Sequence, residues 1–135
     1  MEIPESGQYE VFIMHGIGPK NDLIREQWFK GEHCHRIGYP AIIHYDGGSG
    51  IIVERQYRKN SLIHREDGPA WEKITPQTGV THLEEYYRDD KLHREDGPAR
   101  IMRDPLSGDV WLEEHYLDGE PVSPHATPGP EVPSP

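Results

Sequence analysis

A seven-residue string that occurs twice at a fixed distance constrains the fold of this chain more than any other feature. The string HREDGPA covers His64 to Ala70 and recurs from His93 to Ala99, 29 residues later. Another 29 residues upstream, at His35, the chain reads HRIGYPA and keeps the His, Arg, Pro and Ala of the motif. Recurrence at one period of this length is the signature of a repeat array, in which each unit packs on its neighbours.

The segments between the motifs read as β-hairpins. Residues 70–75 form a strand-like run, Pro76 to Gly79 has the composition of a turn, and residues 80–87 read as the returning strand. Three residues of that strand recur 29 positions later: Leu83, Glu85 and Tyr87 correspond to Leu112, Glu114 and Tyr116. The sequence therefore predicts an all-β fold of tandem antiparallel β-hairpin repeats of about 29 residues.

Both ends of the chain depart from this pattern. Residues 22–29 have fair helix propensity, but Arg25, Gln27 and Phe29 keep the register of the later units, so we expect a strand. The last 15 residues contain six prolines, which lack the amide donor of a β-ladder and favour an extended, disordered tail. We divide the chain into a lead-in with a degenerate repeat (1–24), a repeat domain (25–122) and a flexible Pro-rich tail (123–135).

Strand periodicity assigns the two faces of the predicted sheet. Leu83, Glu85 and Tyr87 share one face, which we assign to the core, and Glu84 points the other way. Because apolar residues make up only 33% of the chain, we expect a thin core. Carboxylates at positions 85 and 114 then require cationic partners, and Arg65 and Arg94 are the candidates.

The repeated motif contains a His, an Arg and two carboxylates, which invites a catalytic interpretation. We favour a structural role, because Asp-Gly-Pro is turn chemistry in which glycine can adopt a positive φ, and because His and Arg can bond the Asp or a neighbouring strand. The structural residues are His64, Arg65, Asp67, Gly68 and Pro69, with their counterparts His93, Arg94, Asp96, Gly97 and Pro98. We expect no catalytic residue.

A zinc site is the next alternative. His33 and His35 lie two residues apart and share a strand face, whereas Cys34 points to the opposite face. The motif histidines at 35, 64 and 93 lie two strands apart, about 9–10 Å, which is too far for a shared zinc ion. We expect no metal and no cofactor, although a pair formed by His33 and His35 with His15 or His44 stays open.

The units LIHREDGPA and KLHREDGPA, with the neighbouring segments EEYY and EEHYLDG, resemble the LHREDGPA repeats of bacterial and phage proteins. These repeats are similar to the MORN-type hairpin repeats and to the YwqK family of antitoxins. The resemblance covers residues 25–122, whereas the Pro-rich tail lies outside it. It implies a MORN-like hairpin array with a binding role in a bacterial cell or a phage-infected host.

The net charge of the chain limits the classes of partner that we expect. The formal net charge of −10 disfavours nucleic acid and suits a basic protein surface, such as the groove of a nucleic-acid-handling protein. With one cysteine, no signal segment and no apolar run that could span a bilayer, we expect a cytoplasmic protein without membrane contact. The expected binding residues are Glu84, Glu113, Asp89, Asp90 and Asp118, with the aromatic residues Trp71 and Trp111.

The expected function is non-enzymatic. We expect the protein to inhibit or neutralise a protein partner, as an antitoxin, an immunity protein or a phage-encoded anti-defence protein does. A scaffold or assembly module without inhibitory activity and a metal-dependent enzyme are the alternatives. The sequence does not indicate the oligomeric state.

Overall fold

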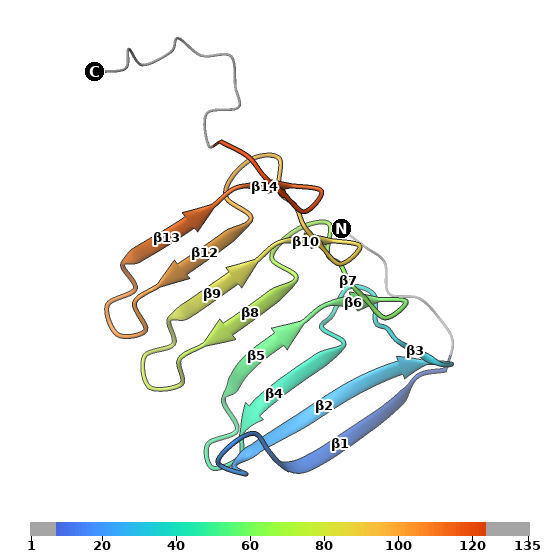
Figure 1. The fold of residues 1–135 in the computed structure, drawn as a ribbon. Helices are drawn as coiled ribbons and strands as arrows, with labels where there is room; N and C mark the ends of the chain where they lie inside the picture. Colours follow the sequence, from blue (N-terminus) through green and yellow to red (C-terminus); the bar gives the residue numbers. More distant parts are fainter. Residues whose placement is uncertain (1–7, 124–135) are drawn as a thin grey trace, which may run out of the picture.

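The computed structural model describes residues 8–123, and in this range the chain is all-β, with strands joined as antiparallel hairpins (Figure 1). The expected fold class is therefore confirmed. Residues 22–29, which also had helix propensity, lie almost entirely in a strand, as their register predicted. The Pro-rich segment 124–135 lies outside the described residues.

Within residues 8–123, one large sheet contains nine strands: β1 (Glu10–Ile17), β2 (Leu23–Lys30), β3 (His33–Cys34), β4 (Ile42–Asp46), β5 (Ile52–Gln56), β8 (Trp71–Ile74), β9 (Thr81–Glu85), β12 (Arg100–Arg103) and β13 (Val110–Glu114). Neighbouring strands follow the order β1-β2-β4-β5-β8-β9-β12-β13, and β3 pairs with the end of β2. Every pairing is antiparallel.

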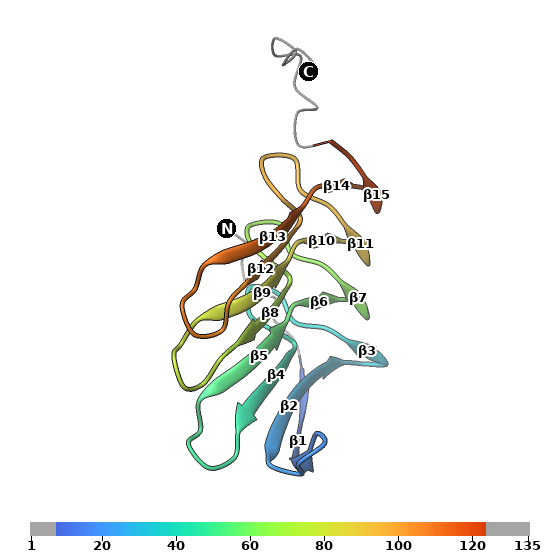
Figure 2. The same cartoon turned by 60° about the vertical axis from the view of Figure 1, so that its left-hand side comes forward.

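Short two-stranded ribbons accompany the sheet: β6 (Arg58–Lys59) pairs with β7 (Leu62–Ile63), β10 (Tyr87–Arg88) with β11 (Lys91–Leu92), and β14 (Tyr116–Leu117) with β15 (Glu120–Pro121). Figure 2 shows these ribbons in a row along one side of the sheet. Each unit therefore consists of a long hairpin in the sheet and a short ribbon beside it.

The first long hairpin, β1–β2, begins earlier than the sequence indicated. Strand β1 pairs with β2 over most of its length, so the sheet already includes residues assigned to the lead-in, and a boundary at residue 25 falls inside β2. No HREDGPA motif precedes β1, which explains why the sequence pattern did not reveal it.

The ribbon turns require left-handed backbone. Their central pairs are Asn60-Ser61, Asp89-Asp90 and Asp118-Gly119, and all six residues have φ values between 48° and 82°. Two successive residues of positive φ are typical of the type I′ turn, which matches the twist of paired strands. Asn, Asp and Gly tolerate this conformation best, so the expected turns near Asp89 and Asp118 are confirmed.

The core is thin and lies on both faces of the sheet. Ala41, Ala70 and Ala99 are 0% exposed and recur every 29 residues, and among residues 8–123 no large side chain is fully buried. Glu85 is buried on one face, and Ile101, which lies opposite Glu84, is buried on the other. The assignment of the core to the Leu83–Glu85 face alone was therefore wrong, because the motif segments also cover the opposite face.

Gly68 and Gly97 serve the motif for a different reason from the one expected. Neither has a positive φ, so the expected left-handed conformation was wrong. A Cβ atom built on Gly97 would lie 2.9 Å from Cζ of Arg94, and the same contact arises between Gly68 and Arg65. Glycine leaves this space to the motif arginine, whose guanidinium would have to move aside for a side chain.

We predict that Gly97→Ala lowers the stability of the protein, because the new methyl group displaces the Arg94 guanidinium. The atoms that must move are the end of a flexible side chain, so the cost is that of weakening the contacts of the guanidinium, about 0.5–2 kcal/mol, which shifts the melting temperature by a few degrees. Gly48→Ala is the matched control, since its Cβ would lie 3.7 Å from the nearest neighbouring atom. Thermal unfolding measured by circular dichroism compares the two variants, and equal melting temperatures would contradict the steric explanation.

Candidate functional site

The motif histidines connect each unit to the ribbon that follows. Nδ1 of His64 accepts a hydrogen bond from the backbone amide of Asp89 at 3.2 Å, and Nδ1 of His93 accepts from Asp118 at 2.9 Å. In the degenerate copy, His35 accepts from Asn60 at 2.8 Å. The donor is in each case the first left-handed residue of a ribbon turn, so the imidazole satisfies an amide that the turn itself leaves without a partner.

The motif arginines hold the same segment against an aromatic ring. Cζ of Arg65 lies 3.9 Å from the ring centroid of Tyr57, and Cζ of Arg94 lies 4.0 Å from that of Tyr86. Stacking of this type contributes about 0.5–2 kcal/mol.

Each of these guanidinium groups also donates to the motif's own backbone. The acceptors are the carbonyls of Pro69 at 3.0 Å and Pro98 at 3.2 Å, and Nε lies 3.3 Å from the motif Asp. The expectation that His and Arg bond the Asp or a neighbouring strand is confirmed.

The carboxylates of Glu85, which is buried, and Glu114, which is half-buried, have a different partner from the one expected. Nε of Arg100 donates to Glu85 at 2.6 Å, and Nη1 of the same residue donates to Glu114 at 2.8 Å. Arg65 and Arg94 do not pair with them, because their guanidinium groups lie over tyrosine rings. Burial and the adjacent Glu85 carboxylate raise the pKa of Tyr87 to about 12.

Two carboxylates also face one another across β8 and β9. Glu72 lies opposite Glu84 in the register, and Glu84 forms an ion pair with Arg103. Burial raises the pKa of the Glu72 carboxyl, and the charge of Glu84 adds to the effect. An acid with a raised pKa is a candidate for catalysis. Neither residue lines the surface depressions described below, so the pair belongs to the packed face of the sheet.

The expected acidic stripe is not continuous. The Glu84 side chain is only 17% exposed and pairs with Arg103, so the expectation that it lies free on the surface was wrong. Glu113 is exposed, but it lies on the edge strand β13. Asp89, Asp90 and Asp118 are exposed together at the ribbon turns, where Asp90 also accepts a hydrogen bond from the Ile63 amide.

The two expected aromatic residues also differ in environment. Trp71 is half-buried, and its Nε1 donates to Glu54 at 2.6 Å. Trp111 on β13 is 65% exposed. Of these two residues, only Trp111 has a ring that is exposed enough to bind a partner.

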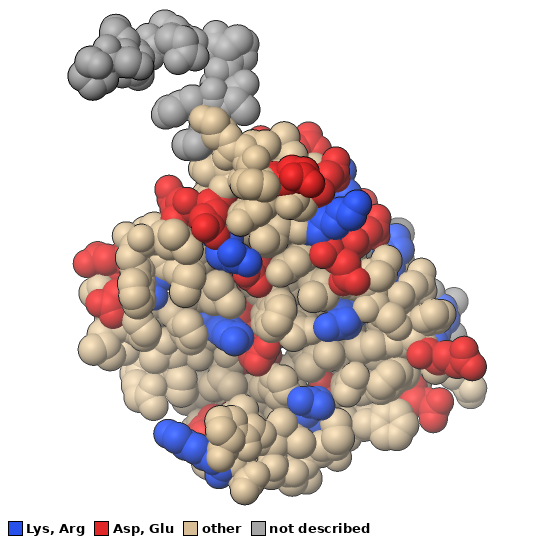
Figure 3. Space-filling model, viewed as in Figure 1, with Lys and Arg blue, Asp and Glu red and all other residues tan. Residues whose placement is uncertain are grey.

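Exposed carboxylates gather instead along the ribbons and motif loops, a surface that we call the acidic ribbon edge. Its members are Glu66, Asp67, Asp89, Asp90, Glu95, Asp96, Asp118 and Glu120. A shallow depression of about 830 Å³ between the two HREDGPA loops is lined by five of these carboxylates and by three arginines. In Figure 3 acidic side chains gather around the upper ribbons, with a few basic residues among them.

The sequence interpretation missed part of this surface. Glu66 and Glu95 were not singled out because the motif was assigned a structural role as a whole. The His, Arg, Gly and Pro of the motif face the protein, whereas the intervening Glu is exposed. At Glu95 the exposed carboxylate still lies 3.4 Å from Nη2 of Arg88 and 3.3 Å from Nε2 of His93. The repetition of that Glu in a loop was the signal that could have identified it.

The candidate metal ligands are engaged elsewhere. Nδ1 of His33 lies 3.2 Å from the Ser61 hydroxyl, and Nδ1 of His35 accepts from the Asn60 amide. Burial is the main cause that raises the pKa of the Cys34 thiol. No group of three or more His, Cys, Asp or Glu that could hold a metal ion occurs between residues 8 and 123.

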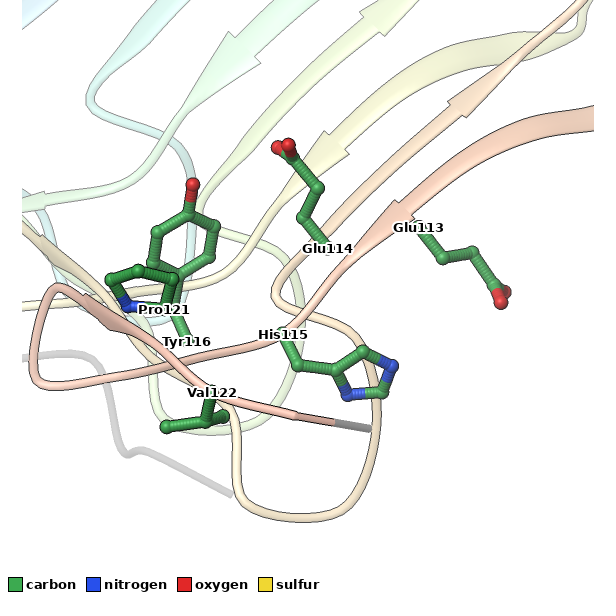
Figure 4. Close-up of a pocket in the computed structure, with 6 residues that line it drawn as sticks. All are labelled: Glu113, Glu114, His115, Tyr116, Pro121 and Val122. Atoms are coloured by element: carbon green, nitrogen blue, oxygen red, sulfur yellow. The ribbon is translucent and has the colours of Figure 1, made fainter. Parts of the chain in front are cut away.

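A second depression, of about 310 Å³, lies beside the last strand of the sheet. Its lining residues are Glu113, Glu114, His115, Tyr116, Pro121 and Val122. Figure 4 shows Glu113 and Glu114 projecting to opposite sides of β13. This depression lies where the array would continue if another unit followed.

Comparison of the chain with family models, curated proteins and solved structures returned no match. In the described part of the chain, no helix has the length and apolar character needed to cross a membrane.

We predict that Arg100→Met destabilises the fold, because it leaves Glu85 buried without its cationic partner. Removing one partner of a largely buried pair costs about 2–4 kcal/mol. Arg88→Met is the matched control, since Arg88 and its partner Glu95 are 53% and 70% exposed, and such pairs contribute about 0–1 kcal/mol. Urea denaturation measures both variants, and an equal midpoint would contradict the central role of Arg100.

Proposed function

We propose that this protein is a non-enzymatic binding protein that inhibits or neutralises a protein partner by covering a basic surface on it. The acidic ribbon edge carries the proposal, because it gathers exposed carboxylates on a chain with net charge −10. The resemblance of the repeats to those of bacterial and phage proteins suggests an antitoxin, an immunity protein or an anti-defence protein.

The different roles of the basic and acidic residues of the motif support a binding role. Its His and Arg are used to join units, and they donate to or accept from backbone groups of the fold. Its acidic residues remain exposed. A surface of this kind supplies charge for recognition, whereas the motif His, the side chain most often used in general acid–base catalysis, is committed to structure.

Repetition also suits an extended partner surface. Equivalent residues in successive units lie two strands apart, about 9–10 Å, so the edge presents carboxylates at a regular interval. A basic groove that normally accommodates a nucleic-acid backbone would present Lys and Arg along such a path. The negative field would steer association with that groove, and the bound protein would compete with nucleic acid.

We predict that Glu66→Lys/Glu95→Lys weakens partner binding by at least about tenfold, because it reverses the charge at equivalent positions of both motif loops. The control is Asp22→Lys/Asp109→Lys, which makes the same change in net charge at exposed residues of the hairpin turns. Affinity capture from a bacterial lysate at low salt identifies the partner, and titration calorimetry then measures binding.

The partner of the wild-type protein should bind in a fixed stoichiometry and dissociate as the salt concentration rises. The control should bind as the wild-type protein does. Binding that tolerates both the Glu66→Lys/Glu95→Lys change and high salt would show that the acidic ribbon edge serves solubility alone.

A further inference from the structure

The two outer strands of the sheet expose apolar side chains. On β13, Val110, Trp111 and Leu112 are 49%, 65% and 37% exposed. On β1, Phe12 and Ile13 are 50% and 52% exposed. Soluble proteins usually protect such edges with charges, prolines or bulges, because an open edge is a template for another strand. Here each outer strand exposes apolar side chains, and its protection includes the exposed Glu113 on β13 and a register shift between Met14 and Ile17 on β1.

The direction of the strands allows one copy to continue the sheet of another. The described path from β1 to β13 contains eight strands, each antiparallel to the next, so β1 and β13 run in opposite directions. If a second copy follows in the same orientation, its β1 lies antiparallel to β13 of the first. This is the relation that β12 has to β9 within the chain.

The register of the β9–β12 pairing predicts the register of a contact between β13 of one copy and β1 of the next. At that junction Glu84 lies opposite Ile101, and Leu83 lies opposite Met102. The residues 29 positions after Glu84 and Leu83 are Glu113 and Leu112, on the open side of β13.

Strand β1 contains the matching partners. Ile13 and Met14 pair with Glu26 and Arg25 in the first hairpin, whereas Ile101 and Met102 pair with Glu113 and Leu112 in the last. Glu26 and Arg25 precede Glu113 and Leu112 by three repeat periods. Ile13 and Met14 therefore occupy the places of Ile101 and Met102, with the same residue types.

The predicted contact, an isoleucine opposite a glutamate on the neighbouring strand, already occurs within the chain. Ile43 lies opposite Glu26, and Ile101 lies opposite both Glu84 and Glu113. Ile13 of a second copy opposite Glu113 would repeat this cross-strand pair. Such pairs are the units that stabilise a sheet.

A backbone donor is also available at the open end. In the interior, the amides of Trp28, Tyr57 and Tyr86 donate to the carbonyls of the alanines that open the next hairpins. His115 follows Tyr86 by 29 residues, and among residues 8–123 no backbone carbonyl accepts from its amide. His115 lines the depression of Figure 4, beside the edge of β13.

We propose that the protein assembles head to tail, with β13 of one copy paired to β1 of the next in the register of the β9–β12 junction. The contact is heterologous, because it uses two different edges, so each added copy leaves a free edge and the array extends with concentration. This inference goes beyond the proposed function, since the ends of the array mediate assembly and the acidic ribbon edge stays exposed along its side.

Sedimentation velocity of the full chain over a concentration series, up to about 1 mM, tests the proposal. The mean mass of the wild-type protein should rise with concentration. Ile13→Glu places a carboxylate opposite Glu113 of the neighbouring copy, and also opposite Glu26 of its own chain, and it should weaken association by about tenfold or more. Ile51→Glu is the control, because Ile51 is 44% exposed in the turn between the interior strands β4 and β5, and it should assemble normally.

The double variant Ile13→Glu/Glu113→Lys should restore assembly. Within one chain these residues lie on opposite outer strands, so a Glu–Lys attraction between them arises only between copies joined head to tail. His115→Pro tests the same junction from the side of β13 by removing the amide donor, and it should also give monomers. Circular dichroism verifies that each variant folds.

A wild-type protein that stays monomeric throughout the series would overturn the proposal. Assembly that persists in Ile13→Glu would overturn it as well, because it would show that β1 takes no part, as in a two-fold pairing of β13 with itself. Loss of assembly in Ile13→Glu without recovery in the double variant, while both variants keep the wild-type circular dichroism spectrum, would rule out the proposed register.

Discussion

Stacking of the motif arginine on an aromatic ring is the contact on which the rest of this thin structure depends. A sheet with few fully buried side chains gains little from apolar burial, so its units must be joined by other means. Arg94 lies over Tyr86 and reaches the Pro98 carbonyl, and the adjacent His93 accepts the amide of the next ribbon turn. Each motif thereby fixes a hairpin, its ribbon and the following hairpin in one arrangement.

As a result, different surfaces of the molecule expose different kinds of side chain. The His and Arg of the motif face the protein, which leaves the carboxylates along the ribbons exposed. The outer strands, which have no further unit beside them in the described structure, expose apolar side chains instead. A repeat array of this kind offers charge along its side and unpaired strand edges at its ends, and the two proposals use these separate surfaces.

The sequence predicted the parts of the fold that are encoded locally. The hairpins and the ribbon turns followed from strand-like runs and from Asp and Gly at fixed positions, and the strand β2 followed from its register with later units. Strand β1 did not, because no motif precedes it and its relation to β12 emerges only from the pairing. The partner of Glu85 was missed for a similar reason. Arg100 on β12 lies next to Glu85 on β9 only because the two strands pair.

The negative charge of the candidate surface could be predicted from the sequence, but only some of its residues could. Net charge indicated an acidic surface, and Asp89, Asp90 and Asp118 lie on it. Glu84 does not, because Arg103 on a neighbouring strand pairs with it. Gly97 was correctly assigned to structure for the wrong reason, since a steric contact with Arg94 has no signal in the local sequence.

Amide hydrogen exchange at the ribbon turns tests most directly whether the motif joins successive units. The amide of Asp118 lies at an exposed turn, yet it donates to Nδ1 of His93. In the wild-type protein it should exchange at least about tenfold more slowly than an unstructured amide. In His93→Ala that protection should be lost at Asp118 and kept at Asp89, whose acceptor is His64. Rapid exchange of the Asp118 amide in the wild-type protein, or unchanged protection in His93→Ala, would contradict the account.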